Sequence, residues 1–319
     1  MKMWRIAAAA AAALGLSART ATAQLPTMPA CQNHPQSTGC AVALQALASA
    51  APQVGIVAAG GNPVPGVEGT RGLTLGIIPR TSLSLRMSTA RVRLPELDDP
   101  QAERTLAPFA LKLSTATQLY GGNAAGTGAL ELLLEGGMLT GTGEGGRTAA
   151  VLGAGGRLGL LRETFGTPGV ALSGAFRHVG PVRYGERCVG LPGCGVGPGG
   201  EADSGVNDFS ARLTVGKRVG PVGLLGGAGW DRFSTTHGVI AYQGSDGFEP
   251  TSGTVAVDVH ESRWSAFANL SYGLTIGSVV AEAGWMSGGD AVNGYTPPPG
   301  GYDPGQGTLF GSIALRIQL

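Results

Sequence analysis

The chain ends on the thirteen residues Gly307–Leu319, GTLFGSIALRIQL, and their pattern decides the fold class. The large apolar side chains share one parity, with a glycine among them: Leu309, Gly311, Ile313, Leu315, Ile317 and Leu319. Small and polar residues take the other parity: Ser312, Ala314, Arg316 and Gln318. A repeat of two indicates a strand with one apolar face and one polar face. We expect such a strand to lie in a closed barrel, where both its edges are paired.

Gly307–Leu319 resembles the carboxy-terminal closing strand of bacterial outer-membrane proteins, except that those strands usually end in an aromatic residue and this one ends in Leu319. The resemblance implies an all-β fold, a transmembrane antiparallel up-and-down β-barrel in which the last strand pairs with the first. It also implies two kinds of partner. These are the barrel-assembly machinery, through Gly307–Leu319, and the lipid and lipopolysaccharide of the outer membrane.

Composition agrees with a barrel that faces lipid. The chain carries 22 basic and 21 acidic side chains, so no charge excess points to nucleic acid as a partner. Charged residues make up 13%, about half the share usual in soluble domains. The 56 glycines lie within apolar alternation and show no collagen-like repeat. No motif predicts a cofactor.

The first residues predict a signal peptide. Lys2 and Arg5 form a basic start, and Ile6–Leu16 is an apolar run too short to span a bilayer. The small residues Ala21–Ala23 predict cleavage before Gln24, so residues 1–23 are the exported chain's leader. We find no later window of about 18 apolar residues, and we expect no transmembrane helix. The predicted location is the outer membrane.

The cysteines form two close pairs, and in an exported chain such pairs predict disulfides. The pairs are Cys31 with Cys40 and Cys188 with Cys194. Free thiols are the alternative. A metal site is disfavoured, because His34 is the one histidine near the first pair and the second pair has none nearby.

The mature chain divides into a lead-in at 24–52 and a barrel at 53–319. Within the lead-in, Ala41–Ala51 predicts a short helix, either a small plug in the lumen or, as we favour, a segment in the periplasm. The barrel is expected to have about twelve strands, with 10–14 compatible with the pattern. The predicted strands are 53–60, 70–78, 81–91, 106–120, 127–139, 147–162, 169–179, 207–217, 221–232, 262–275, 278–287 and 308–319.

The predicted connections alternate between long and short. Gly180–Val206 and Phe233–Glu261 are very long, whereas Arg218–Gly220 and Ile276–Gly277 are tight turns. Long connections outside the cell and short turns in the periplasm are typical of outer-membrane barrels.

Charged residues fall on the parity that we assign to the lumen, and none lies in the middle of a predicted strand on the lipid-facing parity. The predicted lumen-lining residues are Arg86, Lys112, Glu131, Glu135, Arg157, Arg177, Arg212, Asp231, Arg263, Glu282 and Arg316. They either line an aqueous path, which an excess of basic residues would make anion-selective, or pair with one another across a filled lumen. The predicted interface girdle is Trp230, Trp264, Tyr272 and Trp285.

One pair of residues suggests an enzyme. His260 and Ser262 are two apart and share the parity of Trp264, so both are expected to face lipid. This is similar to the His-x-Ser arrangement of outer-membrane phospholipases and lipid A deacylases, in which histidine activates a lipid-facing serine. A third, orienting residue is not evident, because Asn269 and Glu282 have the other parity.

We therefore predict a small porin-like channel or passive transporter. The alternatives are a non-conducting structural or surface-interaction barrel and a lipid hydrolase using His260 and Ser262. An autotransporter translocator domain is disfavoured, because about 29 mature residues precede the first predicted strand and leave no passenger.

Overall fold

The structure is a computed structural model that describes residues 38–66, 81–97, 102–121, 128–141, 148–185, 199–245, 250–292 and 295–318. In these residues, helix α3 (Thr38–Ala59) comes first and strands follow it. The strands are β1 (Thr81–Ala90), β2 (Val92–Pro95), β3 (Glu103–Leu106), β4 (Phe109–Tyr120), β5 (Ala129–Thr140), β6 (Ala149–Leu161), β7 (Gly169–Gly185), β8 (Gly199–Val219), β9 (Val222–Ser245), β10 (Pro250–Ala256), β11 (His260–Gly273), β12 (Gly277–Met286) and β13 (Thr308–Gln318).

Ten of these strands close into an antiparallel barrel. The order is β9-β11-β12-β13-β1-β4-β5-β6-β7-β8, and β8 pairs back onto β9. The chain's last strand, β13, pairs with β1 in a register that sets Leu85 opposite Leu315. The prediction of an up-and-down barrel closed by the final strand is therefore confirmed, and closure leaves the spanning part of the sheet without a free edge.

The strand count differs from the expected twelve, and the difference lies at the start. Predicted strand 53–60 is wrong, because these residues form the second half of α3 up to Ala59. Predicted strand 70–78 lies outside the described residues. The other ten predicted strands correspond to the ten of the barrel. Val54, Ile56 and Val57 have high strand propensity, but burial inside the lumen keeps them helical.

The strands bury and expose alternate side chains. In β1 and in β13, every second side chain faces inward and is buried, and most of the side chains between them face outward and are exposed. Large apolar side chains cover the outer face, among them Leu85, Met87, Leu113, Leu132, Phe176, Leu270 and Leu315, each exposed by 39% or more. So continuous an apolar exterior suits lipid and would be unstable in water.

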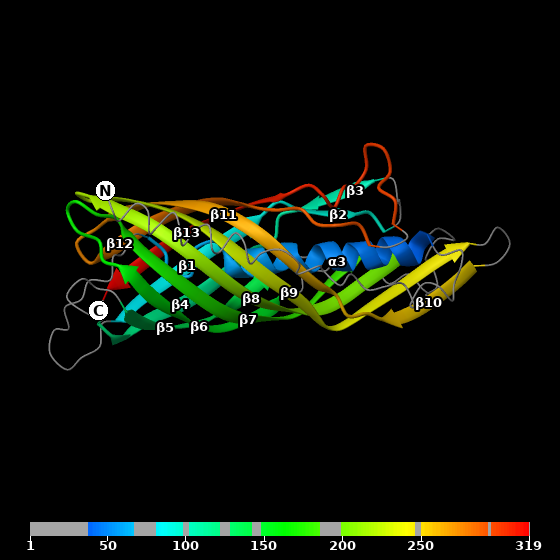
Figure 1. The fold of residues 1–319 in the computed structure, drawn as a ribbon. Coiled ribbons are helices and arrows are strands. Elements are labelled where there is room, and N and C mark those ends of the chain that lie inside the picture. The colour runs from blue at the N-terminus through cyan, green and yellow to red at the C-terminus, as the bar shows by residue number, and fades with distance from the viewer. Residues whose placement is uncertain are drawn as a thin grey trace.

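Helix α3 lies along the axis of the barrel, inside it (Figure 1). Its segment Cys40–Ala59 is long and apolar enough to cross a membrane by composition, so our expectation that no such window exists was wrong. Yet 94% of that window is buried by the protein itself. The helix therefore acts as a core element, and residues 38–52, the described part of the lead-in, lie in the lumen and not in the periplasm.

The two ends of the barrel differ. Tight turns join β8 to β9 and β11 to β12 at one end, which we call the short-turn end. At the other, the long-loop end, β7, β8, β9 and β10 extend beyond the neighbouring strands (Figure 1). Much of the two connections predicted as very long loops is thus strand, including Gly199–Val206 and Phe233–Ser245. The sheet extension and the β2–β3 hairpin both contact α3.

Candidate functional site: the luminal charge cluster at the end of the helix

Helix α3 ends inside the barrel at Gly60. Gly60 has a left-handed φ of 66°, and its N–H donates to the carbonyl of Ile56 at 2.8 Å. This is the glycine C-cap that many helices use, since a side chain is disfavoured at positive φ. A helix end leaves its last carbonyls without partners and carries partial negative charge. In a lumen those carbonyls need donors from the wall.

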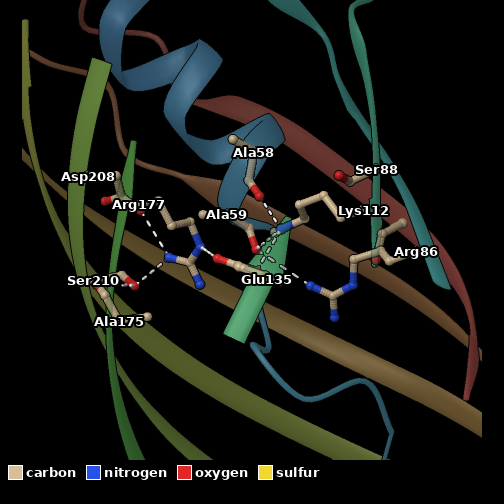
Figure 2. Close-up of polar contacts among 12 residues, drawn as sticks. Ala58, Ala59, Arg86, Ser88, Lys112, Glu135, Ala175, Arg177, Asp208 and Ser210 are labelled. Carbon is tan, nitrogen blue, oxygen red and sulfur yellow. Dashed lines mark hydrogen bonds and ion pairs between the residues drawn. The ribbon is translucent and has the colours of Figure 1, made fainter. Parts of the chain in front are cut away.

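Three basic side chains of the wall supply the donors. Lys112 of β4 donates to the carbonyls of Ala58 and Ala59, the second at 3.2 Å (Figure 2). Arg86 of β1 donates to the Ala59 carbonyl at 3.5 Å, and Arg212 of β8 donates to the Gly61 carbonyl at 2.9 Å. All three side chains are buried. Cations at the carboxyl end of a helix stabilise it, and burial strengthens the effect.

A carboxylate on β12, two strands from β1 in the barrel, binds the two amides that follow the helix. Glu282 of β12 accepts from the N–H of Gly61 and from the N–H of Asn62, both at 2.8 Å. Asn269 and Ser312 also donate to it, at 2.9 and 3.2 Å. Arg86 lies 3.9 Å away and balances the charge. The chain leaving the helix is thus held through both its carbonyls and its amides.

Further ion pairs join these residues to the wall. Glu135 of β5 accepts from Lys112 at 3.3 Å and pairs with Arg177 of β7 (Figure 2). Arg177 also pairs with Asp208 at 3.0 Å. Arg212 pairs with Asp231 at 2.6 Å. We call the set Arg86, Lys112, Glu135, Arg177, Asp208, Arg212, Asp231 and Glu282 the luminal charge cluster.

The luminal charge cluster is electrically balanced, with four basic and four acidic members. Buried charges without partners would cost several kcal/mol each, so pairing is what allows them inside the barrel. Of the two readings left open by the sequence, paired charges across a filled lumen describe this region.

The remaining predicted lumen residues also face inward. Arg157 pairs with Glu131 at 3.1 Å between β6 and β5. Arg263 pairs with Glu261 on its own strand, and Arg316 donates to the Pro65 carbonyl at 3.1 Å. The structure therefore places all the predicted lumen residues on the inner face. The luminal charge cluster consists of predicted residues except for Asp208, which the sequence analysis did not single out.

The half of the lumen nearer the long-loop end is filled by apolar packing. Leu44, Leu47, Val54 and Ile56 of α3 are buried against wall residues. The β2–β3 hairpin closes over the helix, and the side chain of Gln53 pairs with both backbone groups of Arg93 at 2.7 Å. A small apolar cavity remains beside it, between α3, the hairpin and the β7–β8 extension, lined by residues that include Leu47, Val54, Leu106, Val182 and Val206.

Above this packing, the 287–307 connection contributes two tyrosines. The Tyr295 hydroxyl donates to the carbonyl of Tyr302 at 3.2 Å. Burial raises the pKa of both phenols, that of Tyr295 to about 12. Both therefore stay neutral and able to donate hydrogen bonds throughout the physiological range.

The predicted girdle residues face outward. Trp264 and Trp285 are about half exposed, and Trp230 pairs directly with Trp264 across β9 and β11. These lie toward the long-loop end, and Tyr272 lies toward the short-turn end. Aromatic residues at such positions are typical of membrane interfaces.

His260 and Ser262 lie on the outer face at the start of β11. Their cross-strand partners on β9 are Ser234 and Arg232. Among the described residues, no hydrogen bond joins the His260 ring to a serine hydroxyl or to a carboxylate. Asn269 and Glu282 are both buried inside the barrel. The described residues therefore do not show a hydrogen-bonded nucleophile, base and orienting residue at this position.

Of the cysteines, Cys40 lies at the start of α3 and is disulfide-bonded. Its partner lies outside the described residues, as do Cys31, Cys188 and Cys194, so the predicted pairing stays a prediction. Residues 1–23, the predicted signal peptide, also lie outside them.

The sequence analysis did not predict that main-chain groups at the end of α3 are the partners of the wall residues. The carbonyls of Val57 to Asn62 accept from wall residues, including Ser88, whose hydroxyl donates to Val57 at 2.6 Å. One signal was available. Gly60-Gly61-Asn62-Pro63 is a helix-stop pattern after an apolar run that reaches back to Cys40.

Comparison with known proteins gives a likeness in architecture. No family model and no curated protein sequence matches the chain. Among solved structures, the translocator domain of the autotransporter NalP from Neisseria meningitidis is 13% identical with a TM-score of 0.40, covering 76% of this chain and 89% of that one. The outer-membrane protease OmpT from Escherichia coli is 12% identical with a TM-score of 0.35, covering 78% and 100%. The P. putida toluene transporter TodX is 8% identical with a TM-score of 0.23, covering 76% and 89%.

The class assignment rests on the sheet itself, with its ten-strand closure, apolar exterior and buried polar interior. The chain folds as a closed antiparallel β-barrel of the kind seen in outer-membrane proteins, with a helix in its lumen.

Proposed function

We propose that this protein is a surface barrel of the outer membrane, closed by its own helix α3, which holds the segment preceding Thr38 at the cell exterior. The proposal corresponds to the non-conducting, surface-interaction alternative of the sequence analysis. The observation that carries it is the attachment of the chain at the end of α3 by Lys112, Arg86, Arg212 and Glu282.

The direction of α3 supports display at the exterior. Near its start, Gln45 accepts from the N–H of Val292, in the connection between β12 and β13 at the long-loop end. Beyond its end, Pro65 accepts from Arg316, near the short-turn end of β13. The chain thus runs down the lumen from the long-loop end to the short-turn end. If long loops face outward, as in barrels of this class, the segment before Thr38 leaves the lumen outside the cell.

The test is accessibility of a tag on intact cells. An epitope inserted between Ser37 and Thr38 should bind an antibody added to unpermeabilised cells. The matched control is the same epitope inserted in the β8–β9 turn at Gly220–Pro221. The antibody should bind this epitope only after the cells have been permeabilised. An epitope before Thr38 that requires permeabilisation would contradict the proposal.

A small channel is the second candidate, and the polar wall favours it. If α3 left the lumen, Arg86, Lys112 and Arg212 would face water together with their acidic partners. We expect the intact protein to show little conductance in planar bilayers, and variants that release α3 to show more. In those variants the seven predicted basic lumen residues are offset by the four predicted acidic ones and by Asp208 and Glu261, so we expect at most a weak anion-favouring reversal potential. Cation preference would rule out that selectivity.

The lipid-hydrolase alternative remains a prediction with a direct test. Purified protein is incubated with a phospholipid and with lipid A, and released fatty acid is measured. Activity that Ser262→Ala abolishes would establish the enzyme. If the wild type releases no fatty acid, or if Ser262→Ala releases as much as the wild type, the lipid-hydrolase alternative is ruled out.

A further inference from the structure

The outer face of the barrel carries a basic residue near the aromatic girdle. Arg232 lies on β9, two residues beyond Trp230 toward the long-loop end, and its side chain is exposed. Among the residues that the structure describes, it forms no ion pair. Arg232 is the last residue of the predicted strand 221–232, and β9 continues past it to Ser245.

Polar side chains surround Arg232 in two cross-strand rows. Its direct neighbours are Phe209 on β8 and Ser262 on β11. The next row toward the long-loop end is Asn207, Ser234 and His260, in the register of β8, β9 and β11. His178 of β7 extends this row and pairs with Asn207 at 2.8 Å between ring nitrogen and amide oxygen. Successive residues of one parity point to one side of a sheet, so all these side chains share the outer face.

An aromatic surface lies directly below the polar rows, on the side of the membrane interior. Phe209 packs edge to face against Trp230, with ring centroids 6.3 Å apart. Phe176 pairs with Phe209 and Trp264 pairs with Trp230. The exposed fractions of Phe176, Phe209 and Trp264 are 51%, 49% and 51%. Aromatic side chains at a membrane interface accept acyl chains below and headgroups above.

Acidic groups near Arg232 are few on this face. Asp258 is exposed two residues before His260, farther from the membrane. Asp203 and Glu201 of β8 are already paired with Arg183. Asp208, Asp231 and Glu261 point to the lumen, where they are buried and paired with arginines. The outer face at Arg232 is thus positive beside an apolar surface.

We propose that Arg232 and its polar rows bind a phosphate group of lipid A, the lipopolysaccharide anchor, while its acyl chains lie on the aromatic surface. A guanidinium binds phosphate through two parallel hydrogen bonds, and it remains charged at any physiological pH. Asn207, Ser234, Ser262 and the imidazoles supply further donors. The occupant is a lipid because the site continues the surface that faces lipid. It is multiply acylated because the aromatic surface spans four strands. This inference does not depend on closure by α3.

The test compares binding of lipid A and of its dephosphorylated form to purified protein in detergent. We expect the wild type to bind the phosphorylated form roughly tenfold more tightly, in line with one charge-assisted contact. Arg232→Gln should lose most of this preference, and Asn207→Leu part of it. The matched control is Arg91→Gln. Arg91 is also exposed and follows β1, four strands from β9 in the sheet.

Retained gel mobility of unheated protein shows that each variant folds. The proposal is overturned if wild type does not distinguish the two lipids, or if Arg91→Gln lowers the preference as much as Arg232→Gln. It is also overturned if phosphatidylglycerol at equal phosphate competes as well as lipid A, because the site would then be a general anionic-lipid surface.

Discussion

Gly61 and Glu282 are 221 positions apart, and a hydrogen bond of 2.8 Å from the amide of Gly61 to a carboxylate oxygen of Glu282 joins the luminal chain to the barrel wall. The other carboxylate oxygen accepts from Asn62 at the same distance. A carboxylate suits two adjacent amides because it offers an acceptor to each. The contact therefore fixes where the helix stops along the barrel axis.

Glu282→Gln should loosen this attachment. The glutamine side chain keeps one acceptor and turns an NH₂ group toward the second amide, leaving a buried N–H unsatisfied at a cost of about 1–3 kcal/mol. Because the wall strands keep their backbone pairing, we expect the barrel to remain folded. The measurement is single-channel conductance, which should show more frequent openings than wild type. Unchanged conductance with unchanged thermal stability would show that Glu282 does not hold the plug.

Lys112→Met should have a similar effect through the helix carbonyls. The substitution removes this donor from the carbonyls of Ala58 and Ala59. Glu135 then keeps one of its two basic partners, Arg177. We expect a loss of about 1–3 kcal/mol, below the usual cost of breaking a buried pair because Glu135 keeps one partner. Thermal unfolding and conductance measure it. Arg157→Met, which breaks a pair between β6 and β5, is the control. Equal channel opening in both variants would contradict a specific role for Lys112.

Gly60→Ala should destabilise the helix end for two reasons. An alanine at φ 66° costs about 1–2 kcal/mol, and its Cβ would lie 2.7 Å from the Nη1 of Arg86. Gly128→Ala separates the two causes, because Gly128 has φ 82° and no atom lies within 4 Å of the place that an alanine Cβ would take. We expect Gly60→Ala to lower the melting temperature more than Gly128→Ala. Equal shifts would mean that Arg86 moves away freely.

Gln53→Leu should free the β2–β3 hairpin from the helix. Both backbone hydrogen bonds to Arg93 are lost, at roughly 1 kcal/mol each. Amide hydrogen exchange at Val92, Arg93 and Leu94 should then accelerate about tenfold or more, while exchange in β13 stays slow. Gln53→Glu keeps an acceptor for the Arg93 amide and should give an intermediate rate. Protection equal to wild type in Gln53→Leu would show that the hairpin is held elsewhere.

The barrel could be predicted from the sequence because strand alternation is local. Each inward residue, such as Arg212, is two positions from the next, and lipid outside the wall forces the same parity along the whole strand. The helix could not be predicted in the same way. Val54, Ile56 and Val57 favour a strand, and Pro52 argues against a helix interior. They are helical because the lumen surrounds them.

The sequence by itself determined the class of the fold, the closing role of Gly307–Leu319 and the sidedness of the charged residues, since a period of two needs no knowledge of distant contacts. The tertiary structure alone decided that the lumen is occupied. The partners of Lys112, Arg212 and Glu282 are main-chain groups of a helix and its exit that lie 53 to 221 positions away. Main-chain carbonyls and amides are chemically alike along the chain, so the sequence does not indicate which of them a buried charge will bind.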